Sequence, residues 1–92
     1  MHLISTTIAE ADVDQLIEPV RMTNGGWTVR VFNPTRHFMA VLSPEHAARI
    51  ETEVFRLGAH RVAARIRLAR KIASRRAQTA DTRDEGRNER NT

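Results

Sequence analysis

The 44–76 segment most constrains the fold, because it can form a helix that is longer than any strand in a sheet that this chain can build. Ser43, Pro44 and Glu45 have the preferences of a helix N-terminus: a capping hydroxyl, a proline in the first turn and an acid near the positive end of the helix dipole. No proline follows. A continuous helix over this segment would be roughly 50 Å long, whereas strands of about six residues span only roughly 20 Å. The sequence leaves two alternatives, one long helix or a helix pair broken at Leu57-Gly58.

Two apolar stripes follow this segment when it is drawn as a helix. The first stripe consists of Ala47, Ile50, Val54 and Leu57. The second alternates spacings of four and three, as in the heptads of a helix–helix seam, and consists of Ala48, Thr52, Phe55, Ala59, Val62, Ile66, Ala69 and Ala73. A small sheet covers only the first half of a long helix, and so polar a helix is marginal in water by itself. We interpret the second half as a homodimer seam, formed by Phe55, Ala59, Val62, Ile66, Ala69 and Ala73. The alternative is an intramolecular core.

Three apolar runs before this segment predict a small antiparallel sheet. The runs cover residues 17–22, 27–33 and 38–43. Asn24-Gly25 lies between the first two, and this pair is a strong hairpin signal because type I′ turns need positive φ at both central positions. The third run follows a turn at 33–37 and is apolar on both faces, so it is expected to be the central strand. Pro19 cannot donate a ladder hydrogen bond, which indicates an edge strand.

The two ends of the chain complete the predicted fold. Residues 2–9 are rich in β-branched side chains and are expected to form a strand. The acidic segment 10–17 is expected to form a short helix or a turn. Residues 77–92 hold almost nothing that could enter a core, and we expect a disordered tail there. The prediction is therefore a single α+β domain over 1–76, in which a small antiparallel sheet packs on a long C-terminal helix or helix pair.

Charge is unevenly distributed along the chain. Residues 1–53 hold seven acidic and four basic residues, whereas residues 54–80 hold eight basic residues and no acidic one. Such segregation indicates an anionic partner. Because fourteen of the fifteen basic residues are arginine, a compositional bias toward arginine accounts for part of the pattern. It does not account for the missing acids.

The helical wheel gathers most of these charges on the side opposite the second stripe. This basic face consists of Arg61, Arg65, Arg67, Leu68, Lys71, Ile72, Arg75 and Arg76. Arginine offers bidentate contacts to phosphate and guanine, and the apolar pair Leu68 and Ile72 suits a groove or a protein surface better than water. We expect a DNA- or RNA-binding regulator or accessory factor. The alternatives are an inhibitor that binds an acidic host protein, of the kind that phages and mobile elements encode (anti-CRISPR proteins are one class), and an ordinary solvated helix.

Other function classes find little support in the sequence. The four histidines have no partner at a metal-ligand or nucleophile spacing, the chain has no cysteine, and no glycine-rich phosphate loop occurs. We therefore expect no catalytic or metal site, no cofactor and no small-molecule substrate. The N-terminus has no signal-peptide pattern and no apolar run is long enough to span a bilayer, so a cytoplasmic protein without membrane contact is expected. Trp27 either stacks on a base or, in register with Val29 and Val31, enters the core.

Overall fold

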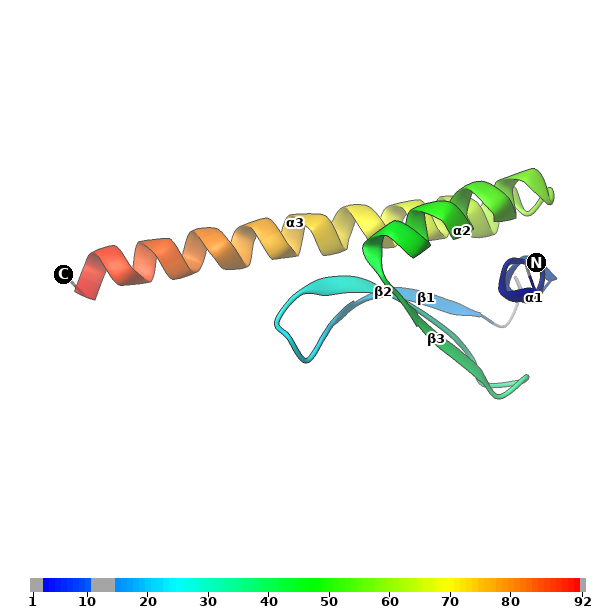
Figure 1. Cartoon of the computed structure of the whole chain (residues 1–92), viewed down its shortest axis with the longest axis horizontal. Coiled ribbons are helices and arrows are strands. Elements are labelled where there is room, and N and C mark those ends of the chain that lie inside the picture. The colour runs from blue at the N-terminus through cyan, green and yellow to red at the C-terminus, as the bar shows by residue number, and fades with distance from the viewer. Residues whose placement is uncertain (1–2, 11–14, 92) are drawn as a thin grey trace.

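The computed structural model describes residues 3–10 and 15–91, and the side chains of residues 4–10 and 15–79. Its elements are α1 (Leu3–Glu10), β1 (Leu16–Arg21), β2 (Trp27–Asn33), β3 (Phe38–Leu42), α2 (Pro44–Arg56) and α3 (His60–Asn91) (Figure 1). The antiparallel pair α2 and α3 lies on one face of the three-stranded sheet, with α1 beside α2. The α+β class, with a small antiparallel sheet and a C-terminal helix pair, is confirmed.

The sheet is antiparallel in the order β1-β2-β3, so β2 is its central strand. The prediction that 38–43 is central is therefore wrong. That run is apolar on both faces, but its outward side chains Met39 and Val41 are exposed in the structure rather than covered. The edge position of the strand that carries Pro19 is confirmed, because β2 is the only described strand with which β1 pairs.

Both predicted turns are present, but the first is not the type I′ turn expected at Asn24-Gly25, because Gly25 has a positive φ and Asn24 does not. In the first, the Gly26 amide donates to Asn24 Oδ1 at 2.8 Å and the Met22 amide to the Gly26 carbonyl at 2.7 Å, with Gly25 at a φ of 91°. The turn that leads to β3 is held by Asn33, whose side chain accepts from the Arg36 amide at 3.1 Å. This second turn sets the register of β2 and β3, in which Val29 opposes Leu42 and Val31 opposes Ala40.

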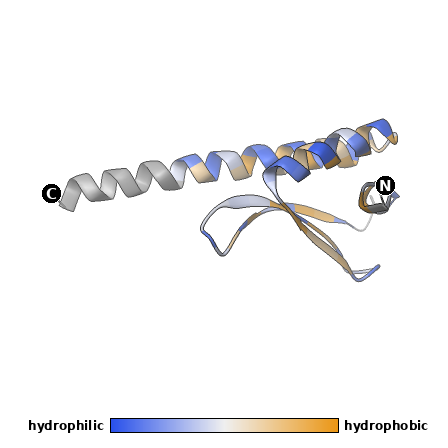
Figure 2. Cartoon of the chain, viewed as in Figure 1, coloured by the Kyte–Doolittle hydropathy of each residue, from blue (hydrophilic) through white to orange (hydrophobic). Residues whose placement is uncertain are grey.

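The core lies between the sheet and the two long helices. Its buried members come from every element except β1, and are Ile8, Val29, Val31, Leu42, Ala47, Ile50, Val54, Val62, Ala63, Ile66 and Ala69. Ile17 of β1 packs against them while remaining partly exposed. Figure 2 shows strands that are largely hydrophobic and helices that alternate hydrophobic and hydrophilic residues, as expected for elements that bury one face.

Of the two helix alternatives, the break at Leu57-Gly58 is the one observed. Gly58 has a φ of +93°, its amide donates to the Phe55 carbonyl at 3.0 Å, and the Ala59 amide donates to the Val54 carbonyl at 3.2 Å. This pair of bonds is a Schellman motif, in which glycine supplies the left-handed residue that other side chains disfavour. Gly58 therefore ends α2 and lets α3 fold back along it.

The fold-back buries the C-terminal half of the second stripe within a single chain. Val62, Ile66, Ala69 and Ala73 are at most 4% exposed, because α3 packs on β2 and β1. Ala59 is half-buried and Phe55 is 56% exposed. The intramolecular core therefore explains the heptad spacing, and the spacing is not an argument for a dimer seam. The first stripe is buried at Ala47, Ile50 and Val54 but ends before Leu57, which is exposed.

The N-terminal segment differs from its prediction, because residues 3–10 form the helix α1 and not a strand. Ile4 and Ile8 are one helical turn apart and both contact the core, with Ile8 fully buried. Ser5 donates a hydrogen bond to Glu53 of α2, and Gln15 Nε2 donates to the Ile8 carbonyl at 2.9 Å. These tertiary contacts override the β-branched preference of the segment. Half of the short helix or turn expected over 10–17 falls on residues 11–14, which lie outside the described residues; Glu10 instead ends α1, and Leu16 and Ile17 begin β1.

The helical backbone of α3 continues to Asn91, past the domain boundary expected after residue 76. No side chain beyond Thr79 is described. The division into a domain over 1–76 and a tail over 77–92 stays a prediction.

Candidate functional site

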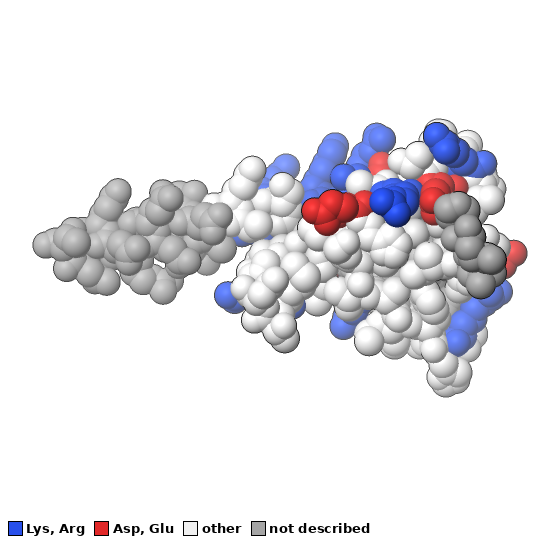
Figure 3. Space-filling model, viewed as in Figure 1, with Lys and Arg blue, Asp and Glu red and all other residues white. Residues whose placement is uncertain are grey.

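The basic face lies on the side of α3 that points away from the sheet. Seven of its members are exposed, and Ile72 is half-buried. Leu68 is 59% exposed, although leucine normally lies in a core. Figure 3 shows lysine and arginine side chains along the upper edge of the molecule, over the helix pair. The structure thus keeps most of the predicted residues on one surface, because Val62, Ile66 and Ala69 hold the opposite side of α3 against the sheet; Arg76 is the exception, since it lies against Trp27 of β2.

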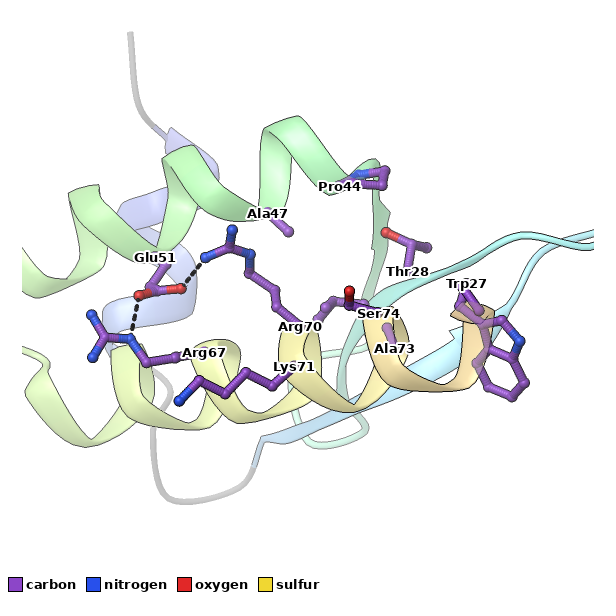
Figure 4. A pocket seen from close by; sticks show the side chains of 12 residues that line it. Trp27, Thr28, Pro44, Ala47, Glu51, Arg67, Arg70, Lys71, Ala73 and Ser74 are labelled. Carbon is purple, nitrogen blue, oxygen red and sulfur yellow. Dashed lines mark hydrogen bonds and ion pairs between the residues drawn. The ribbon is translucent and has the colours of Figure 1, made fainter. Parts of the chain in front are cut away.

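One buried acid binds two of the arginines and sets them apart from the other basic residues. Glu51 of α2 is 12% exposed at its side chain and accepts hydrogen bonds from Arg67 Nε at 3.0 Å and Arg70 Nη1 at 2.5 Å (Figure 4). Charge-assisted bonds to a nearly buried carboxylate hold α3 against α2. Arg67 therefore has a structural role, and Arg70, which the predicted basic face left out, shares it. Arg67 and Arg70 are three residues apart, so both lie on the α2 side of α3. This spacing is visible in the sequence and could have predicted that the two arginines act together.

Arg61, Lys71 and Arg75 form a second group. All three are exposed and make no ion pair with any residue that the structure describes. Arg76 differs again, because its guanidinium lies over the Trp27 ring, 5.1 Å from the centroid. This contact is a cation–π interaction that ties the start of β2 to α3.

An open groove of about 650 Å³ adjoins the basic face. It lies between the N-terminal half of α2, the middle of α3 and the start of β2. Its lining residues are Trp27, Thr28, Val29, Pro44, Ala47, Glu51, Arg67, Arg70, Lys71, Ala73, Ser74 and Ala77. Small and apolar side chains form much of its wall, and Arg70 reaches across it from α3 toward Glu51 (Figure 4). Reasoning from sequence missed this groove because three separate elements build it.

Trp27 is half-buried and lines this groove. Its register with Val29 and Val31 on β2 holds, but those two residues are buried and the indole is not. Trp27 therefore does not join the buried core as one alternative expected: one part of the side chain packs on the protein, and another part borders the groove.

The face of the sheet opposite the helices is a second exposed surface. Leu16, Phe32 and Met39 face one another across the three strands, and Val41 lies beside Arg30. Leu16, Met39 and Val41 are each more than half exposed, and Arg30 forms an ion pair with Glu18 in the middle of this surface. We call Leu16, Phe32, Met39 and Val41 the open apolar face. Contiguous exposed apolar residues of this kind mark interaction surfaces.

The described residues contain no group of three or more histidine, cysteine, aspartate or glutamate side chains that could hold a metal ion. His60 stacks on Phe55, with ring centroids 4.3 Å apart, and His37 lies in the β2–β3 turn at a φ of 52°. The described helices include none with the length and apolar character needed to cross a bilayer.

No family model matches the chain, and comparisons with curated proteins and with solved structures found no match.

Proposed function

We propose that the chain is a cytoplasmic nucleic-acid-binding protein, a regulator or accessory factor, that binds DNA or RNA through the basic face of α3. The observation that carries this proposal is the separation of charge around α3. Arg61, Lys71 and Arg75 are exposed without an ion-pair partner among the described residues, whereas the neighbouring acid Glu51 is nearly buried and bound by two arginines. Exposed cations without adjacent acids can exchange counterions for phosphate oxygens.

The dimensions of the helix support the same proposal. Arg61 and Arg75 are fourteen residues apart, which is about 21 Å along a helix axis. Phosphates on one strand are about 3.4 Å apart along the duplex axis, so the basic face matches a stretch of roughly six nucleotides. A helix with its side chains is about 10–12 Å wide, close to the width of a DNA major groove.

Salt dependence tests the proposal. Fluorescence anisotropy of labelled 20-mers, duplex and single-stranded, is expected to show binding at low salt that weakens steeply as salt is added. If Arg61, Arg65, Lys71 and Arg75 each contact a phosphate, log K against log salt has a slope of about −4 on duplex DNA. Absence of binding to any DNA or RNA at low salt would reject the proposed function.

The exposure of Leu68 favours a second candidate, an inhibitor that binds an acidic host protein. A phosphate backbone offers this leucine no apolar partner, whereas a protein hot spot can enclose it. Leu68→Ala distinguishes the candidates: it should leave nucleic-acid affinity within about twofold, but weaken a protein complex about tenfold or more. A pull-down from host lysate treated with nuclease would supply the protein to be tested, and recovery of no stoichiometric partner would remove this candidate.

We further propose that the homodimer expected from the sequence forms through β3 and not through α3. The two edges of the sheet differ. The β1 edge carries Pro19, Glu18 and Arg21, which oppose strand pairing, whereas β3 has the uncharged sequence FMAVL. Antiparallel pairing of two β3 strands about Ala40 places Met39 opposite Val41 of the second copy, joining the two open apolar faces. A two-fold axis perpendicular to the sheet leaves both α3 helices on the same side.

Light scattering at tens of micromolar protein tests this interface. The wild-type chain should have the mass of two chains, and the Met39→Lys/Val41→Lys variant the mass of one, because like charges then lie directly opposite each other. Leu16→Lys adds a lysine to the same face at the far strand and should remain dimeric. A wild-type mass of one chain, or a dimer that survives both lysines, contradicts pairing through β3.

A further inference from the structure

We propose that the groove beside Trp27 binds an unpaired base, which makes single-stranded nucleic acid the preferred partner of the basic face. This inference rests on the proposed function and specifies its substrate class. The groove and the basic face are continuous, because Arg67 and Lys71 belong to both. A strand whose phosphates follow Lys71 and Arg75 along α3 therefore passes the opening of the groove.

The shape and lining of the groove suit a flat aromatic group. Its volume of about 650 Å³ is within the usual range of small-ligand sites. Ala47, Ala73 and Ala77 project little from their helices, so the space between α2 and α3 is left unfilled. Trp27 offers an aromatic surface at one end. Stacking of a base on such a ring tolerates any base, since each has a π-face.

Arg76 prepares Trp27 for stacking. Its guanidinium lies over the indole at 5.1 Å from the centroid and restricts the orientation of the ring. A base that stacks on the free part of the ring would form one end of a base–indole–guanidinium arrangement, in which the cation–π contact is already made before binding.

The polar groups of the groove favour bases that carry carbonyl oxygens. Arg67 and Arg70 each have one hydrogen bond to Glu51 within the described residues, and a guanidinium has five N–H donors. Lys71 adds three more donors. Among the described lining residues the only carboxylate is that of Glu51, and it already accepts from both arginines. The site therefore presents mainly donors, which match the acceptors of thymine, uracil and guanine better than the adenine edge, which has no carbonyl.

A duplex cannot use this groove, because its bases are stacked and paired. Binding from a duplex would require a base to be extruded, which costs unstacking and unpairing free energy. A single strand has no such cost. An acidic protein segment with an aromatic side chain would have the shape and charge to enter the same groove, so it is the competitor that the test must separate.

Trp27 is the only tryptophan in the chain, and the chain has no tyrosine, so intrinsic fluorescence reports on the groove alone. Titration with a twelve-nucleotide oligothymidylate at low salt should quench this fluorescence, with the same midpoint as anisotropy of the labelled oligonucleotide. Oligoadenylate should bind several-fold more weakly. A twelve-base-pair duplex should bind through phosphate contacts with little quenching.

Ser74→Leu blocks the groove while leaving the reporter and the net charge in place. Ser74 is exposed on α3 and lines the groove, so the leucine needs no core rearrangement. We expect about tenfold weaker oligothymidylate binding and loss of quenching, with duplex affinity unchanged. Thr52→Leu adds a similar side chain to the exposed surface of α2, outside the groove, and should behave as the wild type. Trp27→Leu removes the fluorescent reporter, so its binding is measured by anisotropy of the labelled oligonucleotides. It should likewise lose the preference for oligothymidylate over the duplex.

Each outcome is informative. If the wild type binds nucleic acid but oligothymidylate causes no quenching, or Ser74→Leu binds it normally, the base site is wrong and the proposed function stands. If no nucleic acid binds at low salt, the proposed function itself fails. If a synthetic peptide with one phenylalanine flanked by glutamates quenches Trp27 in a Ser74-dependent way while oligothymidylate does not, the groove binds protein, and the inference is overturned.

Discussion

Arg61→Ala/Lys71→Ala/Arg75→Ala is expected to weaken nucleic-acid binding at least about 100-fold. Each of these side chains is exposed and makes no ion pair with a described residue, so its full charge is available to a phosphate. Charge-assisted hydrogen bonds are worth about 1.5 kcal/mol or more each, so three lost bonds amount to about 4.5 kcal/mol, a factor of roughly 1,000 or more, and 100-fold is the smallest loss that we expect. The slope of log K against log salt should become shallower by about three. Anisotropy titrations at four or five salt concentrations measure both quantities.

A matched control removes the same charge from elsewhere. Arg36, Arg49 and Arg56 are exposed in the β2–β3 turn and on α2, and replacing all three by alanine lowers the net charge equally. This variant should lose no more than a few-fold in affinity, with nearly the wild-type salt slope. Equal losses in the two triple variants would show that total charge, and not the basic face, determines binding. Arg67 is kept in both, because its removal would disturb Glu51 and α2.

Ile66→Ala is expected to lower the free energy of unfolding by about 3 kcal/mol, whatever the protein concentration. Ile66 is fully buried between α3 and the sheet, and truncating a buried isoleucine to alanine loses apolar burial and leaves a cavity. Because the contacts are made within a single chain, dilution should not change the loss. Urea denaturation over a fifty-fold range of concentration measures it, in the Met39→Lys/Val41→Lys background so that β3 pairing does not contribute.

Leu68→Ala is the control on the same helix. Leu68 is two residues away, of equal size and 59% exposed, so its truncation should change the unfolding free energy by no more than about 0.5 kcal/mol. The urea concentration at half-unfolding should not depend on protein concentration, either for Ile66→Ala or for the Met39→Lys/Val41→Lys variant that carries it. A midpoint that rises with protein concentration would instead support the dimer seam between the α3 helices of two chains. The same would follow if Leu68→Ala cost as much as Ile66→Ala.

Local signals in the sequence predicted the parts of this fold that local chemistry determines. Asn24-Gly25 indicated a hairpin, and Ser43 with Pro44 indicated the start of α2. Gly58 indicated the break that was one of the two alternatives for this helix. Ser43 indeed accepts the His46 amide at 3.2 Å as an N-cap. Each of these features depends on backbone conformation within a few residues, so no long-range knowledge was needed.

The incorrect predictions all depended on tertiary contacts. Residues 3–10 have β-branched side chains, yet they form a helix because Ile8 and Ser5 contact the core and α2. β3 was expected to be central because an apolar strand usually has both faces covered, but one of its faces is exposed. The periodic spacing of α3 requires a partner surface for its apolar side, and periodicity alone does not distinguish the chain's own sheet from a second copy.

The candidate site divides in the same way. The basic face is a property of one helix, and the sequence contained nearly all of it. The ion pairs of Glu51 and the groove beside Trp27 combine residues from α2, α3 and β2, whose proximity follows from the register of the sheet and the fold-back at Gly58. Trp27 and Ala77 both line the groove although they are fifty residues apart in the chain. Sequence motifs relate residues that are close in the chain, so they could not predict this proximity.

Pro19 has a further consequence for how many chains can assemble. A sheet that pairs through one edge can continue to grow if its opposite edge also accepts a strand, and growth of that kind produces open-ended fibres. In a dimer joined through β3, both outer strands are β1, and each lacks the amide of Pro19. The pairing therefore closes at two copies, and a chain with a β-branched residue at position 19 would lose this terminator and gain a route to aggregation.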